Sequence, residues 1–207
     1  MTKYNPDIHH RKSIRLKRYN YSKEGAYFVT ICAQNRECLF GSIVDEKIIL
    51  NTAGKMIDSW WKKLFEKFPN IAMDEYIIMP NHIHGIIQIV GAIPCNRPNS
   101  DSPQFDENQT NKNETIMNKG ENMVSPLQSQ NTYDGLGQYI SWFKRMSTNE
   151  YIRNVKQNNW QPFDKRLWQQ NYYEHIILDE NDLNRIREYI INNPANWKKD
   201  ELYVYEK

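Results

Sequence analysis

Residues 91–134 set the strongest limit on what this chain can fold into. The stretch contains eight Asn, four Gln and four Pro, with six acidic residues against three basic ones. Such a composition does not bury enough apolar surface to offset the cost of ordering its backbone. We therefore predict a disordered insertion at 91–134, and a core built from the two blocks that flank it.

The flanking blocks alternate between strand and helix patterns. Apolar and β-branched runs predict strands at 26–33, 71–79, 82–90 and 172–177, with a short hairpin in 39–50. Apolar residues at three- and four-residue spacing predict helices at 51–68, 135–148 and 182–193. This order predicts an α+β fold, with one antiparallel sheet and helices on one face.

The composition limits class and compartment. Hydrophobic residues make up 39% of the 207 residues and charged residues 25%, which excludes collagen-like and fully disordered chains. The three cysteines fit no zinc or redox spacing, and no apolar run approaches the roughly 18 residues of a membrane span. We expect a cytoplasmic protein with no membrane partner.

Positive charge is concentrated in two segments, although the net charge is only +2. Residues 1–24 carry seven basic side chains against two acidic ones, and residues 144–168 carry six against two. Cations interleaved with aromatic rings suit a phosphate backbone with unstacked bases, but a solvated surface is an equal alternative. The candidate contacts to DNA are Arg11, Lys12, Arg15, Lys17, Arg18, Lys144, Arg145 and Trp168.

The sequence motif His82-Ile83-His84 follows a predicted turn at Pro80-Asn81. Side chains at i and i+2 of a strand point to the same face, so the two imidazoles project together. Neutral imidazole is a good ligand for divalent transition metals, and oxygen donors complete such a shell. For so short a pattern, two histidines satisfied by backbone and solvent remain an alternative.

A second pair lies at the end of the last predicted helix. Tyr189 and Asn193 are four residues apart and so share a helix face. Asn193 offers an amide oxygen, and Tyr189 offers a phenol that is a poor nucleophile unless a cation or base assists it. From spacing alone, a core tyrosine and an asparagine that caps the helix before proline explain the pair better than a reactive site does.

Three short sequence motifs, taken together, resemble those of a known family. They are MPNHIHG at 79–85, WQQNYYEHII at 168–177 and REYIINNP at 187–194. They are similar to the REP-associated and insertion-sequence tyrosine transposases, the single-tyrosine branch of the HUH endonucleases. The resemblance runs from the strand at Tyr27 to Trp197, apart from 91–134.

The resemblance implies a ferredoxin-like sheet and cleavage of single-stranded or hairpin DNA through a 5′-phosphotyrosine intermediate. It implies Tyr189 as the nucleophile, and His82, His84 and Asn193 as ligands of Mg²⁺ or Mn²⁺. It divides the chain into a basic segment 1–24, one catalytic domain formed by 25–90 and 135–197, and a tail at 198–207. A homodimer and a single acting chain are both compatible with it.

Three other functions stay open from the residues. A metal-dependent hydrolase would use His82 and His84 without a covalent step. A catalytically inactive descendant of a mobile element would bind hairpin DNA without cutting it. A zinc-stabilised structural domain is disfavoured, because no thiolate spacing supports it.

Overall fold

The computed structural model of the chain describes residues 23–90 and 135–204. Two predicted parts lie outside this range. They are the insertion at 91–134 and nearly all of the basic segment, including Arg11, Lys12, Arg15, Lys17 and Arg18.

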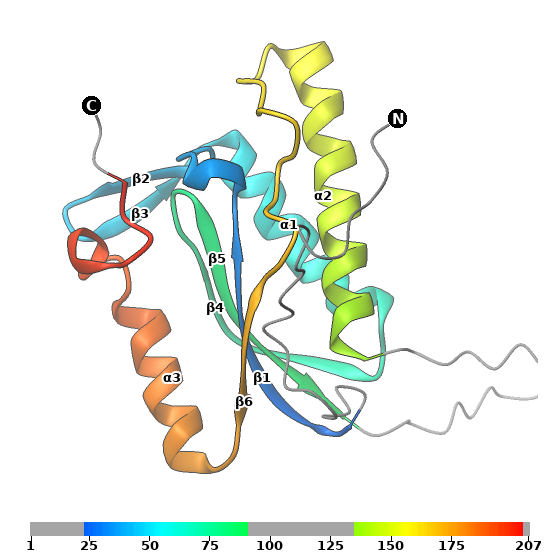
Figure 1. Ribbon diagram of the computed structural model, residues 1–207, viewed down its shortest axis with the longest axis vertical. Helices are drawn as coiled ribbons and strands as arrows, with labels where there is room; N and C mark the ends of the chain where they lie inside the picture. The colour runs from blue at the N-terminus through cyan, green and yellow to red at the C-terminus, as the bar shows by residue number, and fades with distance from the viewer. Residues whose placement is uncertain (1–22, 91–134, 205–207) are drawn as a thin grey trace, which may run out of the picture. The chain divides into compact units, whose positions relative to one another are not determined.

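The main sheet has four strands in the spatial order β4-β5-β1-β6, and each neighbouring pair is antiparallel. With two helices in between, the chain order β1, α1, β4, β5, α2, β6 is that of a ferredoxin-like fold (Figure 1). A separate hairpin, β2–β3, lies between β1 and α1 in sequence. The predicted α+β class is confirmed. The bounds are β1 Gly25–Cys32, β2 Gly41–Val44, β3 Lys47–Leu50, α1 Thr52–Lys67, β4 Ile71–Ile78, β5 His82–Ile89, α2 Leu136–Asn158, β6 Tyr173–Ile177 and α3 Glu180–Asn192.

The helix ends follow from local chemistry. The side chain of Asn51 accepts a hydrogen bond from the Gly54 N–H at 2.9 Å and caps the start of α1. Helix α2 continues well past its predicted end at 148, because buried Tyr151 extends its apolar face by a further turn. It ends where Asn159 takes a left-handed conformation, with φ of 52°.

The helices do not share one face of the sheet, which corrects the prediction. Helices α1 and α2 cover one face, and α3 covers the other (Figure 1). Alternation along the strands explains the division, because Tyr27, Val29 and Ile31 of β1 belong to the α1/α2 core. Phe28 points the other way, into a smaller cluster with Leu183, Ile186 and Ile190 of α3. Side chains that share a face of the sheet with Phe28 therefore face α3.

Strand β5 contacts both layers through alternate residues. Ile83 and Ile87 belong to the α1/α2 core, whereas Ile86 packs beneath α3. Gly85 lies under Trp61 of α1, and a Cβ atom there would come 2.5 Å from Trp61 Cζ2. The glycine after the second histidine thus lets α1 pack closely on the sheet. Within residues 23–90 and 135–204, no helix is long and apolar enough to span a membrane.

Candidate active site

The two histidines of β5 lie side by side beneath the end of α3. Both are buried, with exposed fractions of 0% for His82 and 2% for His84, and their ring centroids are 4.3 Å apart. His82 Nδ1 lies 2.8 Å from Asn81 Oδ1, which can only accept, so His82 Nδ1 carries the proton. Its Nε2 is buried without a partner among the described residues. That nitrogen therefore presents a lone pair to the site.

Asn81 holds its amide group in one orientation. Its Nδ2 donates to the carbonyl oxygens of Arg36, at 3.1 Å, and Leu202, at 2.9 Å. With the nitrogen fixed in this way, the amide oxygen must face His82. Such hydrogen bonds to the second ring nitrogen set the tautomer of metal-binding histidines.

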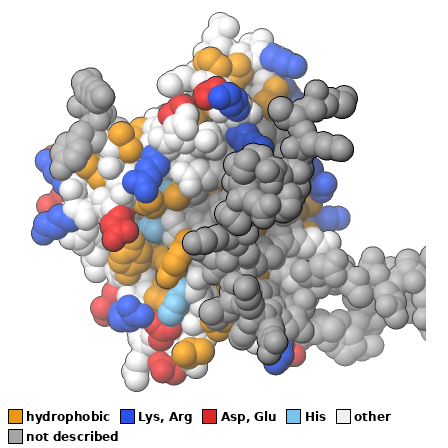
Figure 2. All heavy atoms as spheres, in the orientation of Figure 1, with side chains coloured by type: hydrophobic (Ala, Val, Ile, Leu, Met, Phe, Trp, Pro, Cys, Tyr) orange, Lys and Arg blue, Asp and Glu red, His pale blue; other side chains and the backbone are white. Residues whose placement is uncertain are grey.

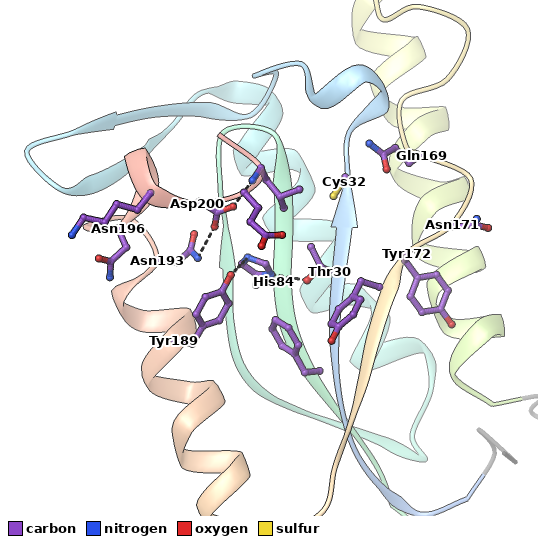
Figure 3. Close-up of a pocket in the computed structure, with 15 residues that line it drawn as sticks. Thr30, Cys32, His84, Gln169, Asn171, Tyr172, Tyr189, Asn193, Asn196 and Asp200 are labelled. Atoms are coloured by element: carbon purple, nitrogen blue, oxygen red, sulfur yellow. Dashed lines mark hydrogen bonds between the residues drawn. The ribbon is translucent and has the colours of Figure 1, made fainter. Parts of the chain in front are cut away.

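His84 connects the sheet to α3 (Figure 3). Its Nδ1 is 2.8 Å from Thr30 Oγ1, directly across the β1–β5 ladder. Its Nε2 is 3.3 Å from the phenolic oxygen of Tyr189. When the phenol donates to Nε2, Nδ1 holds the proton and donates to the threonine hydroxyl. Both histidines thus direct their Nε2 atoms into the site.

Burial keeps both rings neutral. It lowers the pKa of His84 to about 4, with Asp200 opposing the shift. It lowers the pKa of His82 well below the ordinary value of 6.5, assisted by the neighbouring His84 and by Arg36. Neutral imidazole is the form that binds a metal ion.

Tyr189 and Asn193 project from the last turn of α3 toward these rings. Tyr189 is 46% exposed, and its ring lies 5.2 Å from that of His84. Asn193 is 2% exposed, and its Oδ1 is buried without a partner among the described residues. The structure therefore brings together Tyr189, Asn193 and the two histidines, which come from distant parts of the sequence.

A bidentate ion pair holds α3 against the sheet. Arg187 donates to both carboxylate oxygens of Asp74 on β4, from Nε at 2.8 Å and Nη2 at 2.7 Å. Gln88 on β5 donates to the same carboxylate at 2.6 Å. Asp74 lies where the β4–β5 register is interrupted by an irregularity between Met73 and Tyr76. The pair fixes α3 two residues before Tyr189.

Asp200 is a member of the site that the sequence patterns did not reveal. Potential ligand atoms of His82, His84 and Asp200 all lie within 4.8 Å of one another. Asn193 Nδ2 donates to Asp200 Oδ2 at 3.1 Å, which links the carboxylate to the end of α3 (Figure 3). Asp200 belongs to the predicted tail at 198–207, and with Lys199, Glu201 and Leu202 it lines a pocket beside the histidines.

The phenol of Tyr189 is protonated at neutral pH. Partial burial, followed by the negative charge of Asp200, raises its pKa to about 12. A phenol in this environment needs a compensating positive charge before its oxygen can attack an electrophile.

The pocket beside these residues has a volume of about 760 Å³. Phe28, Thr30 and His84 line it from the sheet, and Tyr189 and Asn193 from α3. Its volume is in the range of ordinary ligand sites.

The described residues proposed to contact DNA differ in their surroundings. Trp168 is 4% exposed, packs against Phe40 and Phe143, and donates to Ser147 Oγ at 2.9 Å. It belongs to the core and has no free face for a base, which corrects the prediction. Lys144 donates to three backbone carbonyls in 169–171. Arg145 is exposed.

His175 is a third histidine among the described residues, and it lies on β6. Its Nε2 pairs with Asp182 at 2.8 Å, in the first turn of α3. The contact joins β6 to the start of α3. It does not involve the histidine pair of β5.

Comparisons with known proteins identify relatives and a shared fold. No protein-family model matches the chain. An uncharacterized protein of Haemophilus influenzae (strain Rd) is 40% identical over 205 residues, which cover 98% of each chain. The two proteins belong to one family.

A solved structure of a REP-associated tyrosine transposase bound to a REP hairpin aligns with a TM-score of 0.50. The alignment covers 89% of this chain and 74% of that one, at 18% sequence identity. The chain has the REP-associated tyrosine transposase fold. The resemblance noted in the sequence is thus confirmed at the level of the fold.

Proposed function

We propose that the protein is a metal-dependent endonuclease and strand transferase acting on single-stranded DNA near hairpins. In this proposal it forms a 5′-phosphotyrosine intermediate through Tyr189. The observation that carries it is the position of the Tyr189 phenol, 3.3 Å from His84 Nε2 and beside a second imidazole with an unpartnered nitrogen. The transposase fold supports the same class of reaction.

The residues of the site fit a divalent cation. The orphaned Nε2 of His82 and the orphaned Oδ1 of Asn193 are buried polar atoms, which are costly to leave without a partner. His82, His84 and Asp200 would hold the ion, with Asn193 as a further oxygen donor. Mixed nitrogen and oxygen ligands accept Mg²⁺ or Mn²⁺. When bound, such an ion offsets the negative charge that builds up on a scissile phosphate.

The chain itself supplies the nucleophile and its orientation. The Tyr189 oxygen forms a bond to phosphorus, the bond from phosphorus to the 3′-oxygen breaks, and the phenolic proton ends on the released 3′-hydroxyl. Because one phosphodiester replaces another, rejoining to a second 3′-hydroxyl needs no nucleotide cofactor. Every group named in this step comes from one chain, so a homodimer is not required.

The proposed substrate follows from the solved relative and from charge. That transposase is bound to a REP hairpin. In this chain, Arg145, Lys165 and Arg166 line a groove of about 370 Å³ that also includes Gln169, a residue of the main pocket. We place the DNA backbone along this groove and along the basic segment 1–24. In this proposal the protein acts in the cytoplasm.

A covalent-capture experiment tests the function. The protein is incubated with Mn²⁺ and a pool of strands in which a stable hairpin is flanked by randomised nucleotides. The label is placed at the 3′ end, because the fragment whose 5′-phosphate becomes bonded to the tyrosine keeps its 3′ end. After denaturation, we expect a labelled species at slightly more than the protein mass, and no such species in Tyr189→Phe.

Tyr76→Phe is the matched control. Tyr76 lies on β4 and donates to Asp58 on α1, outside the site, so removal of this phenol should leave the adduct intact. Cleavage without an adduct would indicate a hydrolase. Hairpin binding without cleavage would indicate an inactive DNA-binding descendant. Either result overturns the proposal.

A further inference from the structure

The pocket extends past Tyr189 to an exposed aromatic ring on the edge strand β6. Tyr173 is 55% exposed and contacts Phe28 edge-on, with ring centroids 6.5 Å apart. Tyr189 contacts the same Phe28 ring edge-on at 6.0 Å. Phe28 is 7% exposed, so it forms a floor between two tyrosines that both reach solvent. In Figure 2, hydrophobic and histidine side chains come to the surface next to one another.

The direction of Tyr173 follows from strand alternation. Its neighbour Tyr172 packs toward the α1/α2 core and lies 5.4 Å from the Lys144 ammonium group. Tyr173 therefore points to the face that carries the histidines. A half-exposed aromatic ring beside a reactive group offers a flat face on which a planar ligand can stack.

Gln169 supplies a polar group to the same pocket from a fixed backbone. Its N–H donates to the Cys32 carbonyl at 2.9 Å, and its own carbonyl accepts from Lys144 Nζ at 2.9 Å. Its side-chain amide lines the pocket and has no hydrogen-bond partner among the residues described. Figure 3 shows this amide directed toward β1. An amide can donate and accept at once, which matches the edge of a nucleobase.

We propose that this part of the pocket binds one nucleobase of the DNA strand next to the scissile phosphate. Tyr173 is the stacking platform, and Gln169 reads the edge of the base. The inference rests on the proposed function, because it places a DNA strand across Tyr189. It adds a specificity site that the histidines and Tyr189 do not provide.

The chemistry of the pocket favours a base over another ligand. Every nucleobase has a flat π-face, so stacking on an aromatic side chain is available to any base. A base unstacked at a cleavage site would otherwise expose that face to water. A base stacked on Tyr173 would also lie near Tyr189, because the rings of Tyr173 and Tyr189 both contact Phe28. Binding of this base would therefore fix the register of the DNA strand relative to Tyr189.

An abasic scan tests this inference independently of cleavage. A strand is selected from the hairpin pool by binding to Tyr189→Phe, so that no cut alters it. Single abasic sites are then placed along its unpaired nucleotides, and affinities are measured with and without Tyr173→Leu. We expect one position at which the missing base weakens binding about 5- to 150-fold. In the Tyr173→Leu background, the same abasic site should have little effect.

Two further variants refine the result. Tyr173→Phe keeps the ring and should preserve the abasic effect. At the sensitive position, changing the base should weaken binding, and Gln169→Ala should remove that preference. Equal melting temperatures for the variants would show that the fold is intact.

The outcomes separate this inference from the proposed function. If the abasic profile is the same with and without Tyr173→Leu, the base site is overturned even where the covalent adduct forms. If the coupling to Tyr173 is found but no adduct forms, the base site stands and the strand-transfer proposal fails. If no strand is selected from the pool, both are overturned.

Discussion

The face of the sheet under α1 and α2 is packed with aromatic and branched side chains, such as Trp61, Ile83 and Phe143, all 0% exposed. The face under α3 has a smaller apolar cluster and buries polar groups instead: Thr30, His82, His84 and Asn193. The first arrangement gains free energy from apolar burial. The second leaves two buried atoms that can bind a metal ion, His82 Nε2 and Asn193 Oδ1, without partners among the described residues, which costs stability unless a ligand completes them. The face under α1 and α2 supplies most of the stabilising apolar burial, and the face under α3 has the features of a binding site.

The largest expected effect is a loss of adduct formation when a histidine on the face under α3 is replaced. His84→Gln keeps a polar side chain but removes one imidazole, so adduct formation should fall about 10³-fold, equivalent to roughly 4 kcal/mol. Millimolar Mn²⁺ should raise the melting temperature of the wild type and have little effect on this variant. His175→Gln, on β6, is the matched control and should retain both responses. A variant His84→Gln that kept the Mn²⁺ shift would contradict the assigned ligands.

On the opposite face, Trp61→Ala should lower the free energy of unfolding by about 3–5 kcal/mol, because it opens a cavity under α1. Leu183→Ala, beneath α3, is expected to cost about 2 kcal/mol, since this side chain is 9% exposed in a smaller cluster. Urea denaturation measures both values. Equal losses would erase the energetic difference between the faces.

Acidification should lower the free energy of unfolding through the buried histidines on the face under α3. The pKa of His84 is about 4 in the fold and near 6.5 when unfolded, so the unfolded chain binds more protons between those values. Stability should therefore fall as the pH drops from 6.5 toward 4, by on the order of 3 kcal/mol for this residue. His82 shifts in the same direction. Denaturation with chelator present, compared with His84→Gln, measures the contribution; a pH-independent difference would refute it.

The smallest effect concerns the attachment of α3. Arg187→Met breaks the pair with Asp74, whose side chain is 8% exposed, and should cost about 1–2 kcal/mol of stability. Adduct formation should slow about tenfold, because misplacement of a nucleophile slows reaction strongly. Lys62→Met breaks an exposed pair with Asp58 and should cost less than about 0.5 kcal/mol. Equal effects on the adduct would remove the role of Arg187 in positioning Tyr189.

The strands and helices were predictable because apolar periodicity specifies them, but the face covered by α3 was not. Strand β1 is apolar on both sides, through Tyr27 and Phe28 alike, so its pattern does not show which helix covers which face. Periodicity did predict that His82 and His84 point the same way.

The remaining site residues depend on tertiary contacts. Asp200 lies beyond the last regular helix and reaches the histidines only through the turn after Asn193. Trp168 stands among basic residues in the sequence, yet its indole closes the core beside α2. Neither placement follows from spacing, because each depends on how an irregular segment folds back on the sheet.

Strand β5 makes the chain intolerant of one kind of change. Its residues serve the two faces in strict alternation, with Gly85 beneath Trp61 and His84 beneath Tyr189. Deleting or inserting one residue there would exchange the two sets and turn the imidazoles into the tryptophan layer. Descendants of such a gene can therefore vary this strand by substitution, whereas a one-codon insertion or deletion within it would abolish fold and site together.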